Sequence, residues 1–546
     1  MTPTPTRRGL ARLLSRLADL VQAAEKRRSF RAKAYRTAVW ALDDVSDLDA
    51  DDEELMAITG IGPGVTALIR EYRASGELKQ LIPLEEGYPA DAARLRRLPR
   101  MTPAMLRGLK DLGVEHVDDL RSALGSGAAA TLQGVGQQTL ELWERILDLT
   151  PGPDHVPAHQ AWVIASALST HIAGHAGCSV AIAGSVRRLE EWVDRIDLVA
   201  VTANRLLVDE FLETSSSLRS AQVGPDSIEG VTHSGIEVAI HHALPESGGT
   251  KLLWVTGPPG HAAEVTEDPF PTEHEAYRSV GLPLIAAPAR HLPVDSALEV
   301  IVSDDLRGDF HIHTELSPDG RMPIEEVLSL SRHRGYHYVA ITDHTQGLRF
   351  GGLDETAIAA QAELIATTRP LFPDLMVLHG AELNIGPDGG LDLDPDALEL
   401  LDIAVAGVHS HFGLDESAQT KRVIAALECP SVRVLAHPSG RRIGIRPPLR
   451  LDMETVIDAA VANDVALEVN GHRDRLDLSD EWIRVAAERG AIFAADSDAH
   501  RVAELENIAN AVGVLQRAGV GPDRVVNTWP VDRVLVWAVG RTAARR

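Results

Sequence analysis

The chain has 546 residues, of which 44% are hydrophobic and 24% are charged. This length exceeds that of one ordinary domain, and the composition excludes a disordered or fibrous protein. No run of about 18 or more apolar residues occurs, and the first residues lack the apolar core of a signal peptide, so we expect a soluble cytoplasmic protein without a membrane partner. The two cysteines, Cys178 and Cys429, exclude a disulfide framework and a thiolate zinc site.

The formal net charge of −26 excludes a protein that coats nucleic acid over its whole surface. The charge is unevenly distributed, because residues 1–40 carry ten Lys or Arg and only two acidic residues. This basic segment predicts either a local contact with phosphates or a solvated helical face. Its basic residues are Arg7, Arg8, Arg12, Arg16, Lys26, Arg27, Arg28, Arg31, Lys33 and Arg36.

Residues 8–42 predict two amphipathic helices, and a repeated glycine turn follows. In "LMAITGIGPGVTALIREY" two apolar pieces flank Gly60 and Gly62, and in "AATLQGVGQQTLELWERI" they flank Gly134 and Gly136. The segment "LRRLPRMTPAMLRGL" has the same outline without the two turn glycines. Such turns let the backbone N–H groups at a helix N-terminus approach a phosphate, so we expect these glycines to contact DNA. Ordinary helical hairpins are the alternative.

Strands mixed with helices begin near residue 155, at "SVAIAGS", "IDLVAV" and "IEVAIHHAL". A segment rich in Pro and Ala near 286–305 predicts a domain boundary. Beyond it, seven short apolar strands alternate with helices, which predicts a parallel sheet, closed into a barrel. Six of these strands end in His, Asp or Glu, and "VALEVNG" ends without a residue of ligand type.

The carboxyl ends of parallel barrel strands share one mouth, so these side chains should converge there. Buried packing alone would require a partner for every one of them. Imidazole and carboxylate ligands without thiolate suit Mn, Zn or Fe, and this many ligands suffice for two or three ions. Clustered divalent ions can hold a hydroxide and clamp the oxygens of a phosphate ester, which predicts metal-assisted phosphoester hydrolysis. The strand ends supply His311, His313, Asp343, His344, Glu382, His409, His437, Asp498 and His500, and Asp319 lies in the loop after the first strand. All of these except Asp343 make up the nine predicted metal ligands.

The segments "DLRGDFHIHTELSPDG", "AITDHT", "GAELNI", "GVHSHF", "LAHPSGR" and "DSDAH" resemble the motifs of a PHP (polymerase and histidinol phosphatase) domain of the type fused to bacterial family X DNA polymerases. The earlier segments "FRAKAYRTAVWAL", "GSVRR" and "FPTEHEAYRSVGLPLIAAPAR" resemble other parts of the same family. The resemblance implies a multidomain chain with α-helical helix-hairpin-helix regions, an α+β nucleotidyltransferase-like palm and thumb, and a distorted (β/α)7 PHP barrel. It covers nearly the whole chain.

The resemblance also divides the chain into six parts and gives roles to residues. It implies that the nine ligands hold a trinuclear centre that acts as a manganese-stimulated 3′-5′ exonuclease and, in some relatives, cuts at abasic sites. Asp319 and His344 would act in catalysis beside a metal-bound hydroxide, and Arg441 would contact substrate phosphate or be a plain surface arginine. The expected parts are 1–85 (lyase-like helix-hairpin-helix), 86–152 (fingers-like), 153–232 (palm), 233–292 (thumb-like), 293–308 (linker) and 309–546 (PHP).

The palm departs from the family pattern at its carboxylates. Gly184, Ser185, Arg188 and Asp197 match the family's triphosphate motif, which leaves a vestigial nucleotide site. Arg195 occupies the position of the first catalytic aspartate, where its fixed positive charge opposes a divalent ion. The third position is Ala239. We therefore expect polymerase activity to be lost, unless Asp194 or Glu237 substitutes after a local shift.

Lyase activity is also in doubt, because Leu68 stands where the family's Schiff-base lysine is expected, and no lysine lies between Gly60 and Tyr72.

Three functions remain open. The first is a DNA repair nuclease acting on ends, gaps or abasic sites, with no obligate protein partner. The second is a small-molecule phosphatase or phosphodiesterase. The third is a catalytically silent sensor of DNA ends or nucleotides. A still active family X polymerase is the remaining alternative.

Overall fold

The computed structural model describes residues 5–25, 29–152, 154–294, 299–348 and 351–543. Lys26, Arg27 and Arg28 of the basic segment lie outside the described residues, as does 295–298 of the expected linker. The chain divides into two compact units, residues 1–284 with 444–447 and residues 285–443 with 448–546. The finer division into six parts stays a prediction. Within the described ranges, no helix is long and apolar enough to cross a membrane.

The first unit begins with helices only. The two helices predicted for residues 8–42 form, and they bury the apolar face of "LARLLSRLADL" against the helices that follow. The helices are α1 (Arg7–Ala24), α2 (Phe30–Ala41), α3 (Asp52–Ala57), α4 (Pro63–Ser75), α5 (Ile82–Gly87), α6 (Ala92–Leu95), α7 (Pro103–Asp111), α8 (Val117–Gly125) and α9 (Gln137–Asp148).

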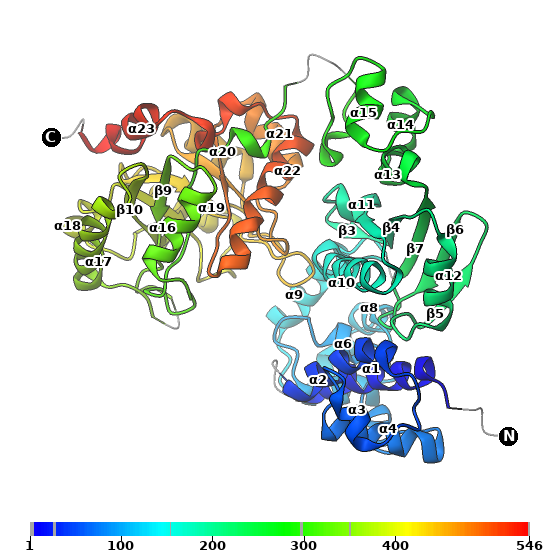
Figure 1. The fold of residues 1–546 in the computed structure, drawn as a ribbon. Coiled ribbons are helices and arrows are strands. Elements are labelled where there is room, and N and C mark those ends of the chain that lie inside the picture. Colours follow the sequence, from blue (N-terminus) through cyan, green and yellow to red (C-terminus); the bar gives the residue numbers. More distant parts are fainter. Residues whose placement is uncertain (1–4, 26–28, 153, 295–298, 349–350, 544–546) are drawn as a thin grey trace. The chain divides into compact units, whose positions relative to one another are not determined.

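A five-stranded mixed sheet follows, in the order β2-β4-β7-β6-β5. Helices α10 and α12 pack on the sheet, as Figure 1 shows, through the alanine and leucine face of α10. The elements are β1 (Val156–Pro157), α10 (Ala158–Ala176), β2 (Ser179–Ile182), α11 (Gly184–Arg187), β3 (Trp192–Val193), β4 (Arg195–Val201), α12 (Arg205–Thr214), β5 (Ser220–Val223), β6 (Ser227–Val231), β7 (Glu237–Ala243), α13 (Gly248–Thr256), α14 (Pro259–Val265) and α15 (Glu273–Ser279).

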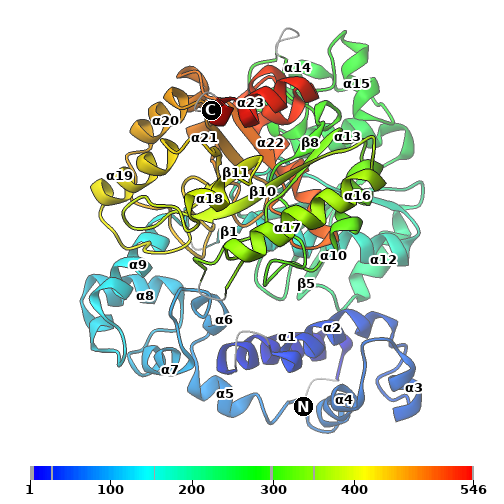
Figure 2. The ribbon, with the colours of Figure 1, turned by 90° about the vertical axis from the view of Figure 1, so that its left-hand side faces the viewer.

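The second unit contains a parallel seven-stranded sheet in the order β14-β13-β12-β11-β10-β9-β8. Helices surround these strands (Figures 1 and 2). The elements are β8 (Gly308–Asp309), α16 (Ile324–His333), β9 (Tyr338–Ile341), α17 (Glu355–Thr368), β10 (Met376–Asn384), α18 (Pro395–Leu398), β11 (Ile403–Gly407), α19 (Glu416–Leu427), β12 (Val432–Leu435), α20 (Met453–Ala462), β13 (Ala466–Asn470), α21 (Asp480–Glu488), β14 (Phe493–Asp496), α22 (Ile508–Ala518) and α23 (Val531–Ala543).

The sheet is nearly closed into a barrel between β8 and β14. Ile312 and Ala499 form a parallel bridge, and His313 N donates to the carbonyl of Ala499 at 2.9 Å. Phe310 N donates to the Asp496 carboxylate across the same seam. The strands are short and buried along their whole length, as expected where helices cover a parallel sheet. The predicted multidomain fold, with a helical N-terminal region and a seven-stranded barrel, is confirmed.

Candidate metal centre

All nine predicted ligands lie at the carboxyl ends of the barrel strands or in the loops that follow. Glu382, near the end of β10, is at the centre of the group. Its Oε1 lies 2.9 Å from Nε2 of both His409 and His437. Its Oε2 lies 2.7 Å from His344 Nδ1 and 3.2 Å from His311 Nε2. One carboxylate therefore contacts imidazoles from four different strand ends.

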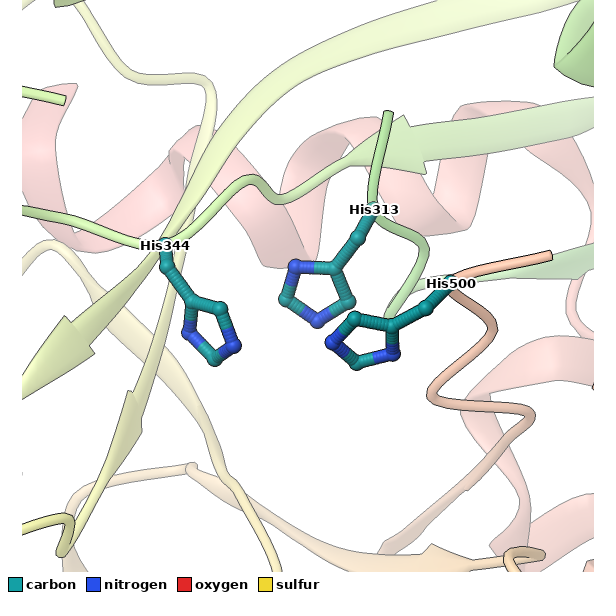
Figure 3. A group of neighbouring side chains, drawn as sticks. All are labelled: His313, His344 and His500. Carbon is teal, nitrogen blue, oxygen red and sulfur yellow. The ribbon is translucent and has the colours of Figure 1, made fainter. Parts of the chain in front are cut away.

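The remaining ligands extend the group on either side of Glu382. Asp498 Oδ1 lies 3.3 Å from His313 Nε2, and Asp319 Oδ2 lies 3.5 Å from His500 Nε2. Figure 3 shows the rings of His313, His344 and His500 turned toward one another, with the His313 and His500 centroids 4.0 Å apart. Three overlapping groups each bring donor atoms close enough to hold one ion: His313/His344/His500, His311/His313/Glu382 and His344/Glu382/His409.

Several of these donor atoms are buried and lie close to one another, yet among the described residues they make no hydrogen bond of acceptable geometry. They include Nε2 of His311, Nε2 of His313, Nδ1 of His344 and Oε2 of Glu382. Buried polar atoms without partners are rare and costly. Here they converge on common points, as ligand atoms around a cation do. The residues therefore fit a divalent metal centre of imidazole and carboxylate ligands.

The protonation of the cluster also suits cations. Burial would raise the pKa of Glu382, but the charges of His344, His409 and His311 hold it well below its usual range. Burial, together with His500 and His344, lowers the pKa of His313 well below its usual range. These two groups therefore present an ionised carboxylate and a neutral imidazole at neutral pH, which are the forms that bind metal. His311 differs, because burial opposes its charge but the charges of Glu382, Glu468 and Asp498 outweigh burial and raise its pKa well above its usual range, so metal binding there would displace a proton.

At the outer edge of the cluster the electrostatics differ. Burial opposes charge on Asp319, yet its contact with His500 and the charges of His500 and His344 lower its pKa to about 2. Burial likewise opposes charge on His500, but Asp319 and Asp498 raise its pKa to about 9. Metal binding at this edge would therefore release a proton from His500. The Asp319 side chain is 42% exposed, so it faces the open side of the centre.

Two ligands have strained backbones. His437 has φ of 30° and Asp498 has φ of 52°, a region that residues with a Cβ seldom adopt. Strain of this kind persists only where surrounding contacts determine the conformation, and it gathers at functional sites. The strain on these two ligands supports a site whose geometry is fixed by the fold.

The sequence interpretation missed residues that contact the ligands. Oε1 of Glu468, in β13, lies 2.6 Å from His311 Nδ1, although this strand was predicted to end without a residue of ligand type. Arg475 follows the same strand, and its Nε lies 3.5 Å from Asp498 Oδ2. Arg475 Nη1 is buried without a hydrogen-bond partner in the described part of the chain. A glutamate inside an apolar strand was the signal that could have identified Glu468.

Arg441, the predicted phosphate contact, donates to the backbone carbonyls of Arg475 and Leu476. It therefore ties the loop after β12 to the loop after β13. A contact with phosphate stays a prediction for Arg441. Arg475 is the arginine of these two that the structure places against a predicted ligand.

In the first unit, the three segments with the predicted turn pattern share one backbone geometry, although only two of them have the turn glycines. Gly60 and Gly134 have φ of 101° and 82°, and the second glycine of each turn caps the next helix, α4 or α9. The segment that lacks the turn glycines forms the same turn, with Arg100 at φ of 62° and Thr102 capping α7.

The two capping glycines, Gly62 and Gly136, face open space, since a Cβ there would meet nothing within 4 Å. The N-termini of α4 and α9 are therefore accessible. The predicted basic segment is partly used within the unit: Arg7 and Arg8 bond to backbone carbonyls, and Arg16, Arg31 and Arg36 form ion pairs. Leu68 is buried in α4.

The palm carboxylate Asp197 is contacted by two basic side chains of the protein. Strands β4 and β7 pair in parallel, so that Asp197 lies beside Ala239 and Arg195 beside Glu237. Asp197 Oδ1 lies 3.0 Å from Arg195 Nη2 and 3.1 Å from His241 Nε2. Asp194 and Glu237, the carboxylates that were considered as substitutes, are both exposed.

Side chains of the "GSVRR" turn are likewise engaged by other residues of the protein. Gly184 lies so close to Asp197 that a Cβ there would come within 2.4 Å of its Oδ2. Arg187 holds Glu273 through two hydrogen bonds of 2.9 and 2.6 Å, and Arg188 donates to Glu190. Ser185, in α11, accepts a hydrogen bond from Glu190 N at its carbonyl.

Comparison with known proteins agrees with these observations. The family model described as "PHP domain" matches residues 309–426. Over 91% of this chain and 93% of the relative, the sequence is 29% identical to the "DNA polymerase/3'-5' exonuclease PolX" of Bacillus subtilis. It is 30% identical to a "Probable phosphatase" of Syntrophotalea carbinolica over 40% of this chain and 90% of that protein. The corresponding values for the "Probable phosphatase YcdX" of Escherichia coli are 27%, 41% and 90%.

The barrel and its imidazole–carboxylate cluster define a PHP-type, metal-dependent phosphoesterase domain. The similarity extends beyond this domain through the helical region and the mixed sheet. Over nearly its whole length the chain is similar to a bacterial family X DNA polymerase (PolX), and its C-terminal unit carries a PHP domain.

Proposed function

We propose that this chain is a DNA repair nuclease whose PHP barrel hydrolyses phosphodiester bonds at DNA 3′ ends, and that its polymerase site is inactive. The observation that carries the proposal is the contrast between the two sites. The barrel aligns unpartnered ligand atoms around Glu382, whereas the palm aligns Arg195 and His241 on Asp197. The name of the Bacillus subtilis relative includes both activities, and this chain would retain the nuclease alone.

Two or three divalent ions, of Mn, Zn or Fe, would be held by the nine ligands from His311 to His500. Bound there, they would supply Lewis-acid activation of water and neutralise phosphate charge. Asp319 and His344 lie beside each other, with Oδ2 and Nε2 3.8 Å apart, on the open side of the cluster. In this proposal they orient the attacking water and carry its proton.

Arg475 would bind a non-bridging oxygen of the scissile phosphate. Its guanidinium is held beside Asp498, and burial, which lowers the pKa of Arg475, is outweighed by the charges of Asp498 and Asp474, which raise it. The buried Nη1 of Arg475 has no hydrogen-bond partner among the described residues, so it is available to a phosphate oxygen. Arg441 would act on phosphate only if its bonds to the 475–476 backbone were exchanged.

The experiment that tests the proposal compares substrates on one preparation of the metal-loaded full chain. The substrates are DNA with a recessed 3′ end, DNA with an abasic site, gapped DNA and a panel of phosphomonoesters. We expect removal of nucleotides from the 3′ end to be the fastest reaction. Much faster turnover of phosphomonoesters would contradict the nuclease assignment and favour the second candidate function, a small-molecule phosphatase, which the names of the Syntrophotalea and Escherichia relatives support.

A separate prediction concerns DNA synthesis by the palm. Two-metal nucleotidyl transfer needs carboxylates free to bind divalent ions, and here Arg195 offers a fixed positive charge to Asp197 instead. We expect no template-directed primer extension with Mg²⁺ or Mn²⁺. Robust incorporation that disappears in Asp197→Ala would show that the palm is active.

DNA binding by the first unit would use the turns that precede α4 and α9. We propose that Gly62, Gly136 and their partners Gly60 and Gly134 receive backbone phosphates of a helix-hairpin-helix type contact. These contacts carry no sequence information, which suits a repair protein.

The location predicted from the sequence, the cytoplasm, remains part of this proposal, as does action without an obligate protein partner. With Leu68 buried in α4, we propose that lyase activity is absent.

The double variant Gly62→Asp/Gly136→Asp separates DNA binding from folding. Aspartate is favourable at a helix N-cap, and both sites face open space, so the helices should stay as stable or become more stable. The new carboxylates would repel phosphates, so we expect affinity for duplex DNA to fall by roughly tenfold, as for loss of about 1–2 kcal/mol. Fluorescence anisotropy with labelled DNA measures this change.

Gly174→Asp is the control for each single change, Gly62→Asp or Gly136→Asp, because it also adds one negative charge, here in α10, where a Cβ also meets nothing within 4 Å. Its DNA affinity should stay close to that of the unmodified chain. Equal losses in the control and in the single variants would show that net charge alone is responsible, and the proposed phosphate contacts would then be wrong.

A further inference from the structure

The strand that brings no ligand to the metal centre carries two buried polar residues that face it. Glu468 and Asn470 lie two residues apart on β13, so their side chains point to the same face of the sheet. Both side chains are fully buried at the level of the ligands. Their burial inside a barrel lined by apolar strands calls for partners, and those partners are residues of the metal centre.

Glu468 uses both of its carboxylate oxygens as acceptors. Oε1 lies 2.6 Å from His311 Nδ1, and Oε2 accepts the backbone N–H of His437. A carboxylate cannot donate, so the proton of this bond lies on His311 Nδ1. The other ring nitrogen of His311, Nε2, lies 3.2 Å from Glu382 Oε2, and its lone pair would be offered to a metal ion bound between these two atoms.

Asn470 holds the ligand on the opposite side of the same subsite. Its Nδ2 donates to Asp498 Oδ2 at 3.0 Å, and its Oδ1 accepts the backbone N–H of His472. Asp498 thereby keeps its other oxygen, Oδ1, turned toward His313 Nε2 and His311 Nε2, at 3.3 and 3.7 Å. Asn470 Nδ2 also lies 3.3 Å from Glu468 Oε2, which joins the two residues into one network.

We infer that Glu468 and Asn470 are positioning residues for the metal subsite formed by His311, His313, Glu382 and Asp498. Glu468 selects the His311 tautomer that can bind metal, and Asn470 fixes the orientation of Asp498. Outer hydrogen bonds of this kind fix ligand orientation and basicity, and their loss costs about 10–100-fold in metal affinity. The inference rests on the proposed metal centre and is independent of the DNA substrate.

The variant Glu468→Gln tests this role with almost no change in volume. A glutamine has one acceptor oxygen, whereas both oxygens of Glu468 face donors. Its NH₂ group must therefore face either His311 or the His437 N–H. In the first case, His311 is forced into the tautomer whose Nε2 is protonated and cannot bind metal. In the second case, a buried donor is left unpaired.

The measurement is equilibrium titration of the apo full chain with Co²⁺, followed by its visible absorption and by the number of ions that remain bound. We expect one Co²⁺ ion that binds tightly to the unmodified chain to bind Glu468→Gln with an affinity lowered about 10–100-fold, so that one fewer ion remains bound. The equivalent assigned to His344, Glu382 and His409 should be retained. Asn470→Ala should weaken the same equivalent, which keeps the inference testable if one variant fails to fold.

Asp477→Asn is the matched control. Asp477 is a buried carboxylate that follows the same strand, but its Oδ1 accepts from Ser439 N. Its Co²⁺ titration should resemble that of the unmodified chain. If folded Glu468→Gln and Asn470→Ala both bind Co²⁺ with unchanged number and affinity, the positioning role is wrong while the metal centre stands. Failure of the unmodified chain to bind Co²⁺ would instead overturn the metal centre and this inference with it.

Discussion

Replacing Glu382 by glutamine should abolish nuclease activity, with a loss of about 10³-fold or more, as expected when metal-based stabilisation of several kcal/mol is removed. Glu382 is the residue that all parts of the cluster share, because its two oxygens contact His311, His344, His409 and His437. The change removes the negative charge and one acceptor while nearly keeping the volume. Initial rates of nucleotide release from a 3′-labelled duplex in the presence of Mn²⁺ measure the loss.

Glu506→Gln is a suitable control, since this exposed carboxylate pairs with Arg334 on the surface of the same unit. Surface ion pairs contribute little, so its activity and melting should be nearly unchanged. His313→Ala and Asp498→Ala should behave like Glu382→Gln. Activity within a few-fold of the unmodified chain in all three ligand variants would place the hydrolytic chemistry elsewhere in the molecule.

Metal binding should raise the melting temperature of the barrel. Glu382, His311 and His313 are buried and charged or polar, and their unpartnered atoms destabilise the folded state unless a cation binds them. An ion present at about 1,000 times its dissociation constant stabilises the fold by about 4 kcal/mol. For a unit of this size that corresponds to roughly 8–16 °C.

Differential scanning calorimetry of the full chain, with chelator and with Mn²⁺, measures this shift. The two compact units provide an internal reference, because the first unit has no comparable cluster among its described residues and its transition should not move. In Glu382→Gln the metal-dependent shift should be largely lost. A transition of the barrel that is independent of metal in the unmodified chain would contradict the centre.

The barrel and the convergence of the nine candidate ligands at its mouth could be predicted from sequence because the signal is local. Each strand is a short apolar run, and in six of the seven a candidate ligand stands at or directly after its end, as in "DFHIH" and "DSDAH". Parallel topology then brings the carboxyl ends of the strands to one mouth without further information. The glycine turns before α4 and α9 could likewise be recognised from neighbouring residues. The same holds for Arg195 in β4, which stands where the family has an aspartate.

Other features depend on contacts between distant segments. Glu468 looked like part of an apolar strand, and only the pairing of β12, β13 and β14 brings it to His311, which lies 157 residues away in sequence. The capture of Asp197 by His241 depends on the parallel register of β4 and β7. The left-handed turn at Arg100 was also hidden, because arginine seldom adopts that conformation.

The central claim is that phosphoester chemistry resides in the barrel and has been lost from the palm. One reaction tests it: a 5′-labelled primer–template, Mn²⁺ and all four deoxynucleotides, incubated with the unmodified chain, Glu382→Gln or Asp197→Ala. We predict that the unmodified chain and Asp197→Ala shorten the primer, that Glu382→Gln leaves it intact, and that no product is longer than the primer. Primer extension that survives Glu382→Gln and disappears in Asp197→Ala would contradict the account.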